Sequence, residues 1–148
     1  MLFRSSTVNW IDALTRNEYK DIVVESLQHC IKEKGMVLNA WVIMSNHVHL
    51  IFSAKPGFLI SNILRDMKKF TSKQIIETIK NNPRESRKEW MVWMFERAGK
   101  RNANNEQYQF WQQDNHPVEL GSPEMLKQRL NYLHERSEER RVGKECRL

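Results

Sequence analysis

The chain lacks the features that mark secreted, zinc-binding and membrane proteins. It has only two cysteines in 148 residues, Cys30 and Cys146, which make neither a disulfide framework nor the CxxC spacing of a zinc site. No apolar run approaches the length that spans a bilayer, and the first residues lack the apolar core of a secretory signal. We therefore expect a cytoplasmic protein with no membrane partner, in which Cys30 is a small buried hydrophobe on a helix.

Internal repeats and low-complexity linkers are also missing. A length of 148 residues suits one domain around one hydrophobic core. Hydrophobic residues make up 40% and charged residues 28%, which is typical of a globular chain. The 24 lysines and arginines exceed the 18 acidic residues, so the net charge is +6. This balance favours polyanions such as nucleic acid as partners, although many globular proteins are mildly basic for no functional reason.

Residues 136–148 differ in composition from the rest of the chain. They have few apolar residues and no helical or strand period, and they resemble the translation of a common sequencing-adapter oligonucleotide. We expect residues 1–135 to form a single domain and residues 136–148 to be a non-native or disordered tail. The alternative is a genuine, solvated tail of charged residues.

Apolar periodicity and turn residues predict the order of helices and strands. Strands are expected over 2–8, 37–44, 47–53 and 108–111, and helices are expected to begin at Thr15, Phe58, Asn82 and Pro123. Thr15 and Glu18 have capping-box spacing, Gly35 can end the first helix, and a tight turn is expected at Ser45–Asn46. This order favours an α+β fold with a ferredoxin-like antiparallel sheet, helices packed on one face and an extra C-terminal helix that carries Tyr132.

The strongest chemical signal is the run Asn46-His47-Val48-His49-Leu50. Successive side chains of a strand point to opposite faces, so His47 and His49 share one face while Val48 and Leu50 face the core. Two imidazoles on one face can offer nitrogens to one divalent cation. The alternative is a pair of hydrogen-bonded polar side chains on a solvated face. Lactamase-type metallo-hydrolases and barrel amidohydrolases, which also use HxH, fit poorly because they need a downstream Asp-His or a much longer chain.

A weaker signal comes from Tyr132 on the last expected helix. Its apolar stripe consists of Leu126, Leu130 and Leu133, and Tyr132 lies off that stripe. A tyrosine in this position, stacked over Arg129, is free to reach into a site. Most helical tyrosines nevertheless only pack, so the position alone indicates little.

Basic and aromatic residues give a third signal. Arg65, Lys69 and Lys73 recur every four residues on the long helix, with Lys68 beside them, where they could follow DNA phosphates. An ordinary solvated helix face is the more common explanation of such spacing. Trp41, Trp90 and Trp93 are expected in the core. Trp111 either stacks on a base of the DNA or packs against the protein.

Two blocks of the sequence resemble a known family. The run Trp41–Ile51, W-V-I-M-S-N-H-V-H-L-I, resembles the V-M-x-N-H-V-H-L signature of the single-tyrosine HUH transposases, and within them the REP-associated branch. The blocks 110–120 and 130–135 resemble a second family motif, whose last part reads Y-I-H-x-N-P in the family. The resemblance covers nearly all of residues 1–135.

The resemblance implies a chemistry for these residues. His47 and His49 would hold Mg²⁺ or Mn²⁺ on the scissile phosphate, and Tyr132 would be the nucleophile that leaves a 5′-phosphotyrosine link. Asn46 would shape the turn, and Arg129 and the basic helix would contact DNA. The implied substrate is single-stranded or hairpin DNA, and the implied assembly is a homodimer.

The chain departs from the family pattern beyond the tyrosine. The family places a polar Asn or Gln, a third metal contact, one turn later, where this chain has Arg136, a cation that cannot ligate a metal. The following N-P and the final strand are replaced by the unusual tail, so we expect weak or no activity. Two alternatives stay open: an inactive hairpin-binding protein that needs neither metal nor Tyr132, and a phosphoesterase that uses water and needs only the histidines.

Overall fold

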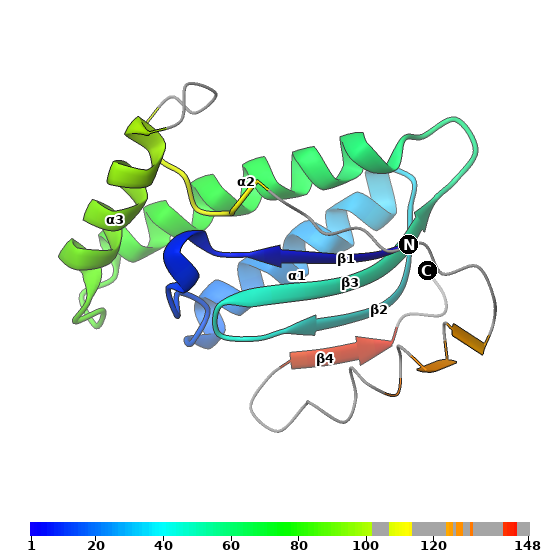
Figure 1. Ribbon diagram of the computed structural model, residues 1–148, viewed down its shortest axis with the longest axis horizontal. Helices are drawn as coiled ribbons and strands as arrows, with labels where there is room; N and C mark the ends of the chain where they lie inside the picture. The colour runs from blue at the N-terminus through cyan, green and yellow to red at the C-terminus, as the bar shows by residue number, and fades with distance from the viewer. Residues whose placement is uncertain (102–106, 114–123, 126, 129–130, 132–140, 145–148) are drawn as a thin grey trace.

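Four strands form one antiparallel sheet. The computed structural model describes residues 1–101, 107–113, 124, 125, 127, 128, 131 and 141–144 (Figure 1). The strands are β1 (Leu2–Ser6), β2 (Met36–Ile43), β3 (His47–Ala54) and β4 (Arg141–Lys144), in the order β1-β3-β2-β4. Strand β4 falls within residues 136–148. That these residues are a non-native or disordered tail stays a prediction.

Three helices accompany the sheet. Helices α1 (Asn17–Glu33) and α2 (Ile60–Asn81) run side by side over one face of the sheet, and α3 (Lys88–Lys100) lies near the far end of α2 (Figure 1). A short 3-10 helix, η1 (Val8–Trp10), follows β1. Gly35 ends α1 with a φ of 72°, as its position predicts. In the described part of the chain, no helix is both long and apolar enough to cross a bilayer.

The two faces of the sheet carry different side chains. Val48, Leu50 and Phe52 of β3 point into the main core, where they pack with apolar residues of α1 and α2. Cys30 is buried in this core, as predicted. The opposite face holds a smaller apolar cluster of Leu2, Ala40, Val42 and Ile51. The α+β fold with helices on one face is therefore confirmed, and the opposite sheet face carries this apolar cluster beside the polar residues of β1 and β3.

Three expected helix starts are displaced, and one of them is that of α2, which begins at Ile60 rather than at Phe58. Helix α1 begins at Asn17 rather than at Thr15, and its N-cap, Arg16, makes no side-chain cap hydrogen bond. Helix α3 begins at Lys88, because Asn82 and Pro83 belong to a loop instead of a helix start. Asn82 Oδ1 accepts a hydrogen bond from the Arg84 backbone N–H at 3.0 Å, which is an Asx turn. Residues of the 82–87 loop are thereby free to contact the loop that precedes α1.

The tryptophans separate into buried and exposed groups. Trp90 and Trp93, expected in the core, are 48% and 51% exposed, because α3 turns Met91 and Phe95 inward instead. Trp41 is partly buried against the core. Trp111 packs rather than offering a base platform: it is buried, and its Nε1 donates to Thr71 Oγ1 at 2.9 Å. Residues 108–111 form a single bridge to Thr7 in place of the expected strand.

Candidate functional site

His47 and His49 lie together on the sheet face opposite α1 and α2, as the alternation predicts. Their ring centroids are 4.9 Å apart with the planes at 85°, and only 6% and 9% of the two residues are exposed. In the antiparallel pairing of β1 with β3, Ser6 lies opposite His47 and Arg4 lies opposite His49. Two adjacent imidazoles so oriented can offer nitrogens to one cation.

Asn46 fixes the orientation of the first histidine. Its Oδ1 lies 2.7 Å from His47 Nδ1, and its Nδ2 donates to the Trp10 carbonyl at 3.5 Å. Because the amide oxygen can only accept, His47 carries its hydrogen on Nδ1, and Nε2 has the lone pair that a metal ligand requires. The Asn46 carbonyl in turn accepts from the Thr7 backbone N–H at 2.9 Å. Asn46 therefore orients the ring as well as shaping the turn.

The residues at this site fit a metal ion in part. Residues 1–101 and the shorter described segments contain no group of three or more His, Cys, Asp or Glu that could hold a metal. The described donors are the two imidazoles, of which Asn46 orients that of His47, and the other ligands would be water, a DNA phosphate or a further residue. Nitrogen donors suit a transition metal such as Mn²⁺ better than Mg²⁺, whose usual ligands are oxygens.

A polar network holds the turn that carries the histidines. Ser45 Oγ donates to Asp12 Oδ1 at 2.9 Å, and the Leu14 backbone N–H donates to the Ser45 carbonyl at 2.8 Å. Arg87 then donates to the Asp12 carbonyl at 3.0 Å and to Thr15 Oγ1 at 3.3 Å. The turn at Ser45–Asn46 is thus linked through the loop before α1 to the loop between α2 and α3.

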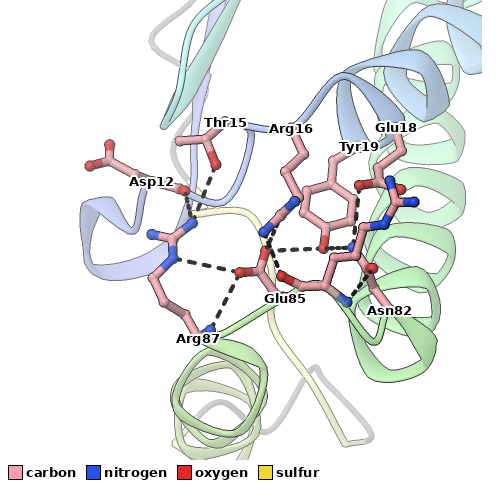
Figure 2. Close-up of polar contacts among 9 residues, drawn as sticks. Asp12, Thr15, Arg16, Glu18, Tyr19, Asn82, Glu85 and Arg87 are labelled. Atoms are coloured by element: carbon pink, nitrogen blue, oxygen red, sulfur yellow. Dashed lines mark hydrogen bonds and ion pairs between the residues drawn. The ribbon is translucent and has the colours of Figure 1, made fainter.

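Glu85 is the centre of that network, and sequence reasoning missed it. Figure 2 shows Arg16, Tyr19 and Arg87 converging on its carboxylate. The Arg16 Nε and the Tyr19 hydroxyl donate to Oε1 at 3.2 and 3.0 Å, and Arg87 lies 3.8 Å from Oε2. Burial raises the pKa of Tyr19 to about 12, so its phenol keeps the hydrogen that it donates. An isolated glutamate in a basic loop carries no sequence signal for this role.

Arg4 and Trp10 were also missed. The guanidinium carbon of Arg4 lies 5.4 Å from the centroid of the Trp10 ring, and Trp10 is 54% exposed. Alternation along β1 places Arg4 and Ser6 on one face, and this signal was available in the sequence. Their position beside the histidines was not, because it depends on the pairing of β1 with β3.

The structure does not bring the basic residues of α2 to the histidines. Lys69 and Lys73 are exposed on α2, which covers the other face of the sheet. Arg65 pairs with Asp66 at 3.1 Å, and Lys68 Nζ donates to the Gln112 carbonyl at 3.0 Å. Of the predicted site residues, Asn46, His47 and His49 form one cluster and the lysines lie apart from it.

Tyr132 and Arg129 lie outside the described residues. A groove of about 450 Å³ between η1 and α3, lined by Asn9, Met94 and Arg97 among others, contains none of the predicted site residues.

Comparisons with known proteins decide the family. The family model described as "Transposase IS200 like" matches residues 11–135, most of the chain. The chain belongs to the IS200-like transposase family. The crystal structure of a protein described as a transposase from Deinococcus radiodurans R1 has the same fold, with a TM-score of 0.52. The match covers 92% of this chain and 89% of that one, at 14% identity, so it supports the fold alone. No curated protein matches this IS200-like transposase.

Proposed function

We propose that this IS200-like transposase nicks and rejoins single-stranded DNA through a 5′-phosphotyrosine intermediate on Tyr132, beside a divalent metal held by His47 and His49. The observation that carries the proposal is the cluster of Asn46, His47 and His49 on one sheet face, in a chain whose family is defined by DNA transposition. The role of Tyr132 as the nucleophile is inferred from the family resemblance.

The proposed step exchanges one phosphoester bond for another. The Tyr132 phenolic oxygen attacks the scissile phosphorus and forms a phosphotyrosine bond, while the bond from phosphorus to the 3′ oxygen breaks. The phenolic proton passes to solvent or a nearby base, and the departing 3′ oxygen gains a proton to become a hydroxyl. A metal ion bound at the histidines would supply positive charge to the phosphate oxygens. Asn46 keeps His47 in the tautomer that can bind such an ion.

Among the chain's three tyrosines, the two described ones are poor nucleophiles for this site. Tyr19 is fully buried in the main core, its hydroxyl is bound to Glu85, and burial raises its pKa to about 12. Tyr108 packs against the same core, with Lys80 Nζ 4.3 Å from its ring centroid. The histidines lie on the opposite sheet face, so these positions favour Tyr132.

DNA of single-stranded or hairpin form is the proposed substrate, and a homodimer is the proposed assembly. The net charge of +6 supports a polyanionic partner. Lys69 and Lys73, exposed on α2 far from the histidines, would contact a distal part of the DNA, together with Arg65, Lys68 and Arg129.

Incubation with Mn²⁺ and a labelled hairpin oligonucleotide, followed by denaturing electrophoresis, tests the proposal. We expect a weak covalent protein–DNA band that disappears in Tyr132→Phe and His49→Ala but persists in the matched Tyr108→Phe. DNA binding without a band, in this chain and in Arg136→Gln, would favour an inactive hairpin-binding protein. Cleaved DNA without a band, still formed by Tyr132→Phe, would instead indicate a phosphoesterase that uses water.

A further inference from the structure

Arg4 carries a buried donor that the rest of the described chain leaves unsatisfied. Its Nε is buried and has no hydrogen-bond partner among the described residues. A buried donor on a cationic side chain loses its hydration without compensation, which is costly unless a ligand supplies the acceptor. Arg4 lies directly opposite His49 on the same sheet face. An anionic ligand at the histidines would therefore be close to this guanidinium.

Trp10 is held beside Arg4 by an unusual backbone. Asn9 and Trp10 have φ angles of 53° and 55°, in the left-handed region that asparagine adopts readily but a bulky residue such as tryptophan rarely does. Strain of this kind costs on the order of 1–3 kcal/mol per residue and persists where neighbouring contacts enforce it. Here the Trp10 carbonyl accepts a hydrogen bond from Asn46 Nδ2 at 3.5 Å, and the Trp10 backbone N–H donates to the Thr7 carbonyl at 3.2 Å. The residue that orients His47 thus also positions an indole that is 54% exposed.

We propose that Arg4 and Trp10 form a binding site for one unpaired nucleotide of the DNA strand. In this site the Arg4 guanidinium binds a non-bridging phosphate oxygen, and the Trp10 ring stacks on a base. A stacked duplex hides the faces of its bases, so the indole selects single-stranded DNA next to the cleavage position. The site rests on the proposed function for its ligand class, and it adds a specificity-determining contact to that reaction.

The chain contains a matched control for this pair. The Arg97 guanidinium carbon lies 5.3 Å from the Trp93 ring centroid, and Trp93 is 51% exposed. The distance between cation and ring and the exposure of the tryptophan match those of Arg4 and Trp10, whereas Arg97 is exposed and Arg4 is half-buried. The two pairs also differ in location, because Trp93 is on α3, whereas Trp10 is bonded to the turn that carries His47. Only the pair on β1 and η1 is expected to recognise the nucleotide.

Binding measurements in EDTA test the site without requiring cleavage. Fluorescence anisotropy is measured with hairpin oligonucleotides that carry an abasic site or a neutral methylphosphonate at each position of a single-stranded flank. We expect one abasic position to weaken binding of the unmodified chain roughly ten-fold. Trp10→Ala should weaken binding of intact DNA by the same factor and lose sensitivity to that position. Arg4→Gln should lose sensitivity to one methylphosphonate in the same way, and Trp93→Ala should keep both sensitivities.

Several outcomes would overturn the site. The first is that Trp10→Ala and the abasic position each weaken binding and that the two losses multiply, as for independent sites. The second is that Trp93→Ala loses the same sensitivities as Trp10→Ala. The third is that the unmodified chain does not bind the oligonucleotides. Arg4→Lys, which keeps a cation and should retain part of the methylphosphonate effect, replaces Arg4→Gln if the latter does not fold. Because EDTA prevents metal-dependent nicking, the site can pass this test when the covalent band is absent, and it can fail when the band is present.

Discussion

The side chains of Asn46 and His47, neighbours in the sequence, form a hydrogen bond of 2.7 Å between Oδ1 and Nδ1. The Nδ2 of the same Asn46 amide donates to the Trp10 carbonyl, which turns the amide oxygen toward the His47 ring. His47 therefore presents Nε2 as its basic nitrogen. Partners of this kind orient a ligand and raise its basicity, so Asn46 belongs to the metal site that we propose.

Replacing Asn46 should weaken metal binding. We expect Asn46→Ala to lower the affinity for Mn²⁺ roughly 10- to 100-fold, because His47 loses the acceptor that fixes its tautomer. Asn46→Asp should retain most of the affinity, since a carboxylate still accepts from Nδ1. Titration of Mn²⁺ followed by electron paramagnetic resonance measures the change, with the exposed Asn62→Ala as control. Equal affinities for Asn46→Ala and Asn62→Ala would rule out this role.

Glu85 should be important for stability. Its side chain is 2% exposed and binds Arg16, Tyr19 and Arg87, so Glu85→Ala leaves these donors without their acceptor. We expect the free energy of unfolding to fall by about 3–5 kcal/mol in Glu85→Ala, and by less in Glu85→Gln. Chemical denaturation measures both. The exposed Glu89→Ala should change stability by no more than about 0.5 kcal/mol, and a similar loss at both positions would contradict the network's importance.

Tyr19 should make stability depend on alkaline pH. Burial raises its pKa from 10.0 to about 12, so the folded chain holds the phenolic proton more tightly than the unfolded chain. This contribution is complete below pH 10 and is lost as the pH rises to about 12, which amounts to about 2–3 kcal/mol. Tyr19→Phe is expected to be less stable near neutral pH, because Glu85 and Asn82 lose a partner.

The comparison of the two chains over pH isolates this effect. The stability advantage of the unmodified chain over Tyr19→Phe should be constant from about pH 8 to about pH 10 and should shrink between about pH 10 and about pH 12, as measured by urea denaturation. An advantage that stays constant over that range would show that Tyr19 does not titrate as described.

Arg136 should limit the proposed reaction. The family resemblance places a polar metal contact at this position, and a guanidinium has no lone pair to give a cation. We expect Arg136→Gln to increase the yield of the covalent protein–DNA band roughly ten-fold or more. Arg101→Gln serves as a control for the loss of one positive charge. Equal changes in yield for Arg136→Gln and Arg101→Gln would show that the effect comes from net charge and would contradict this prediction.

The elements that the sequence predicted best were those with strong local patterns. The alternation of apolar and polar residues in 47–53 correctly placed His47 and His49 on one face, and the apolar period of α1 correctly buried Cys30. The helix starts at Thr15 and Asn82 were wrong, because Thr15 accepts a hydrogen bond from Arg87, while Asn82 ends α2 and forms an Asx turn with Arg84. Local propensity cannot foresee a partner such as Arg87, which is 72 residues from Thr15.

The same reason explains what was missed at the site. Arg4 lies beside His49 only because β1 pairs with β3, and Glu85 meets Arg16 across 69 residues of chain. Trp93 looked like a core residue because α3 is rich in large apolar side chains, and only the packing shows which of its faces is buried. Pairing and packing depend on the whole fold, and single-sequence patterns report only the local part.

The most direct test of the central claim is to locate the DNA on the protein. The chain and its Arg136→Gln variant are incubated with Mn²⁺ and hairpin DNA, digested with nuclease and trypsin, and analysed by mass spectrometry. The account predicts a nucleotide mass on the peptide that contains Leu130–Glu135, whose only tyrosine is Tyr132. A nucleotide on Tyr19 or Tyr108, or nicked DNA with no modified peptide, would contradict it.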